Sequence, residues 1–121
     1  MSYFSDVEQD LTALLESGVN APITFDFVYT SDSQKAVVIN NLVVDYDNNF
    51  SLDNSRKTMT FSLGLVANSH DDLNDLIEEI DSLNGASNGH CQHFLINTIT
   101  YGTYDQDTFT ADMSCEVELY G

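Results

Sequence analysis

The chain has 121 residues, with 20 acidic side chains against three basic ones, and therefore a formal net charge of −17. This length suits a single domain with one core, residues 1–121, and a hydrophobic content of 42% argues against disorder. The charge excludes a basic patch for gripping nucleic acid, and no run is apolar enough to cross a membrane. The acidic start has no basic segment and is unlike a signal peptide, so we expect a soluble protein made in the cytoplasm.

The first predicted element is a helix that ends at Gly18. Ser5 and Glu8 form a Ser-x-x-Glu capping box at its start. The apolar stripe of this helix consists of Val7, Leu11, Leu14 and Leu15. Such a stripe predicts that the helix packs on a sheet.

Two strands are predicted next. Residues 23–30 alternate between apolar and polar, residues 31–33 favour a turn, and residues 36–44 are apolar and β-branched. Asn40 and Asn41 interrupt the second of these strands. The interruption predicts a bulge or a change of sheet partner.

Residues 45–57 are polar and Asn-rich, and we expect them to form the tip of a long, projecting β-hairpin. The segment opens like a calcium-binding loop at Asp45. However, Phe50 stands where such a loop needs Gly, and Arg56 stands where it needs Glu, which excludes an EF-hand.

Residues 59–84 form a strand followed by a helix, the unit around which the chain is organised. The strand, residues 59–66, places Met59, Phe61, Leu63 and Leu65 on one apolar face. Ser69 is the expected N-cap of the helix, and Gly85 ends it. The buried stripe is expected to be Leu73, Leu76, Ile77, Ile80 and Leu83, and the opposite, acidic face carries Asp71, Asp72, Asp75, Glu78, Glu79 and Asp81.

The C-terminal part is predicted to contain two more strands. Residues 86–93 are expected to be a loop, residues 94–101 a strand, and residues 102–107 a turn. The last strand, residues 109–120, alternates most clearly, with one apolar and one acidic face. The order of elements predicts an α+β domain: a mostly antiparallel sheet of four to five strands, two helices packed on one face, and a long β-hairpin.

Few residues indicate chemistry. His90, Cys91, His93 and Cys115 are a weak match to a zinc site, and loop histidines beside a buried thiol are the alternative. The sequence contains neither a Gly-rich phosphate loop nor a nucleophile elbow. We therefore expect no enzymatic activity, no cofactor and no metal.

The pattern of residues 59–120 resembles the tail terminator (tail-completion) proteins of long-tailed bacteriophages. Three features carry the resemblance: the strand with its acidic helix, the turn Tyr101-Gly102-Thr103-Tyr104-Asp105, and the aromatic-led strand 109–120. The N-terminal helix and the long hairpin also fit. The low number of Lys and Arg residues departs from the pattern expected for this family.

The resemblance implies a structural virion protein that forms a ring, expected to be hexameric, in the tail or neck. The ring caps the tail tube, stops its polymerisation and joins the tail to a head-completion or neck protein, while DNA passes through the lumen without specific binding. The candidate contacts with partners are Tyr46, Phe50, Leu52, Arg56, Lys57, Tyr104 and Asp105. The candidates for an acidic lumen or outer face are Asp71, Asp75, Glu78, Glu79, Glu116 and Glu118.

Two alternatives remain at this point. One is another head–tail connector or neck protein, and the other is an acidic protein that mimics DNA and binds a basic enzyme. The strong acidity is also compatible with a saline habitat. The oligomeric state separates the ring from the mimic.

Overall fold

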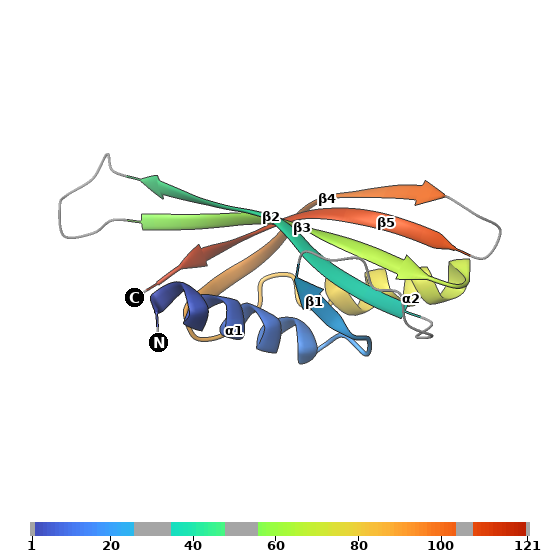
Figure 1. Cartoon of the computed structure of the whole chain (residues 1–121), viewed down its shortest axis with the longest axis horizontal. Helices are drawn as coiled ribbons and strands as arrows, with labels where there is room; N and C mark the ends of the chain where they lie inside the picture. The colour runs from blue at the N-terminus through green and yellow to red at the C-terminus, as the bar shows by residue number, and fades with distance from the viewer. Residues whose placement is uncertain (1, 26–34, 48–55, 104–107, 121) are drawn as a thin grey trace.

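In the part of the chain that the structure describes, two helices cover one face of a five-stranded sheet, whose strand order is β1-β2-β3-β5-β4 (Figure 1). The computed structural model describes residues 2–25, 35–47, 56–103 and 108–120. Along the chain the elements are α1 (Tyr3–Glu16), β1 (Ile23–Phe25), β2 (Lys35–Asp47), β3 (Arg56–Ala67), α2 (His70–Asp81), β4 (Cys91–Thr103) and β5 (Phe109–Leu119). The predicted α+β class is confirmed, with both helices on the same side of the sheet.

Strand β1 differs from the prediction. It pairs parallel to β2, with Ile23 opposite Val37, whereas strands joined by a tight turn would run antiparallel. The expected turn at residues 31–33 and the second half of the expected strand 23–30 lie outside the described residues. The sheet is therefore mixed, with its one parallel pair at an edge.

The long hairpin is confirmed as an antiparallel pair of β2 and β3, from Lys35 opposite Ala67 to Asp47 opposite Arg56. The register shifts between Asn40 and Val43, and the backbone of Asn41 is left-handed, with a φ of 55°. The predicted bulge is therefore present. It lets β2 keep its apolar side chains toward the helices on both sides of the shift.

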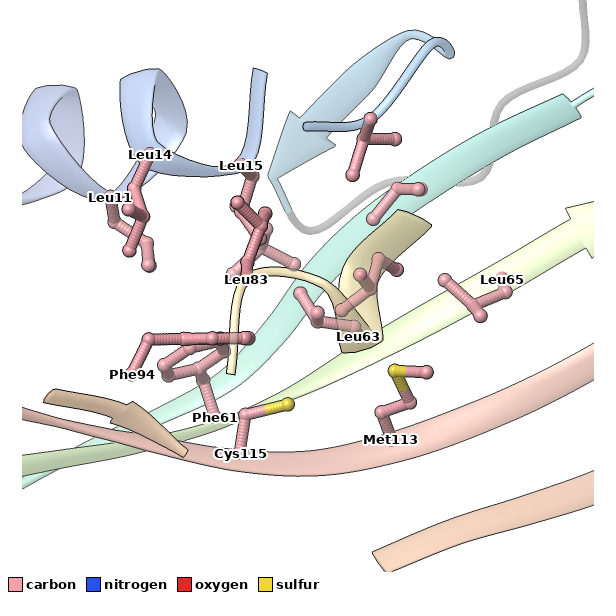
Figure 2. Close-up of a cluster of buried hydrophobic side chains, with 14 of the residues drawn as sticks. Leu11, Leu14, Leu15, Phe61, Leu63, Leu65, Leu83, Phe94, Met113 and Cys115 are labelled. Carbon is pink, nitrogen blue, oxygen red and sulfur yellow. The ribbon is translucent and has the colours of Figure 1, made fainter. Parts of the chain in front are cut away.

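The core lies between the helices and the inner face of the sheet. Figure 2 shows leucines of α1 meeting side chains from β3, β4 and β5. The predicted core residues Phe61, Leu76, Ile80 and Met113 are at most 3% exposed. None of the fully buried residues in the described part of the chain is polar or charged. The strict alternation on β3 and β5 therefore separates a dry face from a wet one.

Helix α1 begins earlier than predicted. Its N-cap is Ser2, whose side chain accepts a hydrogen bond from the backbone N–H of Ser5 at 3.1 Å. The proposed capping box at Ser5 and Glu8 is wrong, because Ser2 provides an equally good cap one turn earlier. The predicted stripe of α1 is buried in full.

Gly18 and Gly85 follow the two helices, and they have different roles. Gly85 has a φ of +90°, but α2 ends at Asp81 with Ser82 as its C-cap, so the prediction that Gly85 ends the helix is wrong; Gly85 lies in the turn beyond, where its N–H donates to the carbonyl oxygen of Phe94. Gly18 instead needs to be small, because a Cβ there would lie 2.8 Å from the side chain of Leu83. Helix α2 itself ends at Asp81, so Leu83 packs from the turn beyond it.

Strand β4 starts at Cys91, so the predicted loop 86–93 is too long by three residues. The strand carries two register shifts, and His93 adopts a φ of 56° between the ladder positions Gln92 and Leu95. These irregularities broke the alternation and hid the start of the strand from the sequence pattern.

We expect Leu76→Ala to lower the free energy of unfolding by about 2–5 kcal/mol, because it leaves a cavity in a fully buried site between α2 and the sheet. Denaturant unfolding measures this loss. The exposed neighbour Asp75 provides the control, Asp75→Ala, which should change stability by about 0.5 kcal/mol or less. A loss below about 1 kcal/mol for Leu76→Ala would contradict the docking of α2.

Candidate assembly surfaces

The base of the hairpin places two predicted contact residues side by side. Lys57 faces Tyr46 across the ladder, on the side of the sheet that the helices cover. The Nζ atom of Lys57 lies 5.2 Å from the ring centroid of Tyr3 in α1 and 5.5 Å from that of Tyr46. Both distances are within the range of cation–π attraction. Lys57 therefore ties the start of α1 to the hairpin.

The structure describes only some of the other residues that were predicted to contact partners. Arg56 pairs with Asp47, so Arg56 and Lys57 belong to the ladder and not to a free tip, which corrects the predicted tip boundary. Phe50 and Leu52 lie outside the described residues. So do Tyr104 and Asp105, which the sequence placed in the turn before the last strand.

Aromatic side chains gather at this end of the domain, which we call the aromatic end: Tyr3, Phe4, Tyr46 and Tyr120. The rings of Tyr3 and Phe4 are in edge contact, and the hydroxyl of Tyr3 donates to the carbonyl oxygen of Tyr120 at 3.1 Å. Phe4, Tyr46 and Tyr120 are exposed. The sequence pattern identified only Tyr46, because the three other residues come from the two ends of the chain.

The acidic face of α2 is exposed at Asp71, Asp75 and Glu78. Glu79 is half-buried, and its carboxylate accepts a hydrogen bond from the backbone N–H of Asn20 at 2.9 Å. Glu79 therefore fixes the segment that leads from α1 to β1. It has a structural role that the helical spacing did not reveal.

The other acidic candidates lie on the face of the sheet turned away from the helices, which we call the outer face. Glu116 accepts a hydrogen bond from the Asn97 side chain at 3.1 Å, and Glu118 accepts one from the Tyr120 hydroxyl at 3.2 Å. The acids of α2 and those of β5 thus lie on opposite sides of the domain. A single wall cannot carry both sets.

His90 and Asp10 join the start of β4 to α1. The Asp10 carboxylate accepts from the His90 backbone N–H at 2.9 Å and lies 2.8 Å from His90 Nδ1. The backbone hydrogen bond is the main reason why the pKa of Asp10 falls below its usual value, and the side-chain contact adds to it. Asn88 donates to the Asp10 carbonyl oxygen, so this turn is held at several points.

The cysteines do not support the weak zinc match. Cys91 and Cys115 are buried, and burial raises the pKa of both thiols to about 12. Among the described residues, no group of three or more His, Cys, Asp or Glu side chains could hold a metal ion.

The chain matches no protein-family model and no curated protein sequence. Its fold is similar to that of a chain in the virion of a native gene transfer agent (GTA) particle, with a TM-score of 0.68 and 12% sequence identity. The alignment covers 95% of this chain and 92% of that chain. The two chains therefore share one fold over nearly their whole lengths. None of the helices in the part of the chain described by the structure is long and apolar enough to cross a membrane.

Asp10→Asn should lower the free energy of unfolding by about 1 kcal/mol near pH 6, a value reduced because the carboxylate is partly solvated. A carboxyl whose pKa is depressed by folding stabilises the protein above its unfolded pKa, about 3.8, and this contribution disappears as the pH falls through the lower folded pKa. The difference from the wild type should therefore shrink below pH 3.8. Unfolding curves across this pH range provide the measurement.

The control for the loss of one charge is Asp75→Asn on the exposed face of α2. It should not reproduce the destabilisation seen near pH 6. A constant difference between the wild type and Asp10→Asn at every pH would contradict the role given to the carboxylate.

Trypsin has three possible cleavage sites in this chain, after Lys35, Arg56 and Lys57. The structure places all three residues in paired strands, so we expect slow cleavage of the free protein at a rate that follows opening of the sheet. Low concentrations of urea should accelerate it. Mass spectrometry of timed digests checks this, and rapid cleavage after Lys57 without urea would contradict the ladder at the base of the hairpin.

Proposed function

We propose that this protein is a structural component of a phage-like virion, and specifically a tail terminator that forms a ring. The observation that carries the proposal is the shared fold, over nearly the full length, with a chain of the gene transfer agent virion. The order of elements and the acidic unit of β3 and α2, which suggested the tail terminator family, are consistent with it. Assembly into a ring, expected to be a hexamer, belongs to the proposal.

The charge distribution supports a role beside DNA without binding it. Acids are exposed both on α2 and on the outer face, at Asp112 and Glu118. Of the two lysines, Lys35 is half-buried and Lys57 is held by aromatic rings. A lumen wall with these properties would let DNA pass without adhesion. We therefore propose a passive conduit and no enzymatic activity.

The proposed mechanism is complementarity of surfaces. One surface of the ring would match the end of the tail tube and stop its growth, and the other would receive a head-completion or neck protein. The candidate contacts remain Tyr46, Phe50, Leu52, Arg56, Lys57, Tyr104 and Asp105. The aromatic end adds Phe4 and Tyr120, whose side chains are exposed. Exposed aromatic side chains are enriched at protein interfaces, which supports this end as a site of contact.

The acidity itself favours a second candidate, an acidic protein that mimics DNA. Such a protein would act as a monomer or dimer and bind a basic enzyme. A different connector or neck protein would share the virion but occupy another position. The size of the assembly distinguishes the DNA mimic from the ring.

We expect the purified protein to form rings whose assembly depends on ionic strength. Six copies at −17 would carry a charge of about −100, so repulsion opposes closure at low salt. At 0.1 M salt the reach of this repulsion falls to about 10 Å. Mass measurement by analytical ultracentrifugation, over a series of NaCl and MgCl₂ concentrations, should show one closed species replacing the monomer as salt rises.

Negative-stain imaging of the high-salt sample should show rings with a central hole. A sample matched in ionic strength with a monovalent salt distinguishes screening from specific binding of magnesium. A monomer in every condition and at high protein concentration would overturn the ring and favour the DNA mimic.

A further inference from the structure

Strand β4 forms one edge of the sheet, and the first half of this edge is already covered. The backbone N–H of Phe94 donates to the carbonyl oxygen of Ala86 at 2.9 Å, and the Phe94 carbonyl oxygen accepts from Gly85. The backbone N–H of Ile96 donates to the side-chain oxygen of Asn84 at 2.9 Å. The turn after α2 therefore acts as a short extra strand up to Ile96.

The second half of the edge, which we call the open edge, consists of residues 97–103. Its ladder with β5 runs regularly from Thr98 opposite Ser114 to Thr103 opposite Phe109. On its other side, no group in the described part of the chain makes a hydrogen bond with its backbone. Within the residues that the structure describes, the open edge therefore presents backbone donors and acceptors without partners in a regular β-conformation, the template for adding a strand.

The composition of this region is unusual for so acidic a chain. Residues 82–104 contain no Asp, Glu, Lys or Arg, although the chain has 20 acids. Thr98, Ile99 and Thr100 are β-branched and Tyr101 is aromatic, all of which favour strands. The open edge also lacks the Lys and Pro residues that protect exposed edges against association.

Apolar side chains of the open edge are exposed on the helix side of the sheet. Ile99 is 38% exposed and Tyr101 is 54% exposed. The hydroxyl of Tyr101 donates to the Asn74 side chain of α2, which fixes the ring beside the edge. An added strand would cover these side chains as well as the backbone.

We propose that the open edge is where a second copy of this chain adds an extended strand. A second copy fits because both molecules carry −17, and the neutral edge is where they can approach with the least repulsion. A basic partner would instead be drawn to the acids of α2 and the outer face. This inference rests on the proposed ring and names the contact that closes it.

The geometry of the added strand decides the type of assembly. If β4 pairs with β4 of the second copy, the contact is two-fold and ends with a dimer. If β4 pairs with a different segment, each copy contacts its two neighbours through two different surfaces, and a ring can close. The proposed ring requires the second arrangement.

The test introduces lysines at two exposed positions of the open edge, Thr98→Lys and Thr100→Lys together. Lysine on an edge strand opposes the addition of another strand. The new Lys at position 100 would face Asp112 across the ladder, which favours the fold. We expect the protein concentration needed for half-assembly to rise about tenfold or more, as measured by ultracentrifugation at high salt.

The matched control is Thr58→Lys with Thr60→Lys, on the same face of the sheet but in the internal strand β3. These positions face Glu118 and Glu116 across the ladder with β5. Both double variants change the net charge from −17 to −15, which by itself favours assembly. The control should therefore assemble at least as readily as the wild type, and circular dichroism should show that both variants are folded.

The possible outcomes test the strand contact and the ring independently. Rings that persist unchanged in the edge variant would overturn the contact and leave the ring standing. A wild-type dimer that the edge variant abolishes would support the strand contact and overturn the ring. A wild-type monomer in every condition would overturn both.

Hydrogen exchange gives a second measurement that does not depend on a substitution. On assembly of the wild type, backbone amides within residues 97–103 should slow about tenfold or more, because those facing outward gain partners. Amides of residues 91–96 should change little, since their outer edge is already bonded within one copy. Unchanged exchange at the open edge in an assembled sample would overturn the proposal.

Discussion

The structure depends on burying one face of the sheet while the carboxylates of the described residues stay out of the core. Strand β5 shows this at each step: Met113 and Cys115 point into the core, whereas Asp112 and Glu118 point outward. Burial of apolar side chains contributes about 1.5–3 kcal/mol each, and like-charge pairs on α2 cost about 0.2–0.5 kcal/mol each. Burial therefore decides the fold, and the acids are concentrated on the two outer surfaces of the layers.

The parts of the fold that were predictable are those whose signal is local. Alternation on β3 and β5 and the stripe of α2 each involve residues a few positions apart, and all were correct. The parallel pairing of β1 with β2 was not predicted, because side chains alternate with the same period in parallel and antiparallel strands, so the sequence pattern does not give the direction of a pairing. The start of β4 was missed for a related reason: His93 breaks the alternation, and the hydrogen bonds that hold it come from the turn after α2.

The same contrast between local patterns and distant contacts applies to the candidate surfaces. Tyr46 and Lys57 were both predicted to contact a partner, and the structure places them opposite each other at the base of one hairpin. No pattern in the sequence indicated that Tyr3 also contacts Lys57, or that Asp10 binds the turn at His90. Contacts between residues this far apart in the chain leave no periodic trace. The acidic faces of α2 and β5 could be assigned to surfaces in advance, because they follow from helical spacing and from strand alternation.

The same separation of charge from burial constrains how such a domain can associate. Screening limits the reach of charge repulsion to about 10 Å at 0.1 M salt. The charges close to a contact therefore decide how strongly association is opposed, and not the total net charge of −17. An acidic contact would also have to desolvate its carboxylates, and the chain has few cations to pair with them. Backbone hydrogen bonds at a neutral edge carry neither cost, and their fixed direction sets the orientation of the neighbour. In this chain, uncharged backbone between residues 97 and 103 offers that combination.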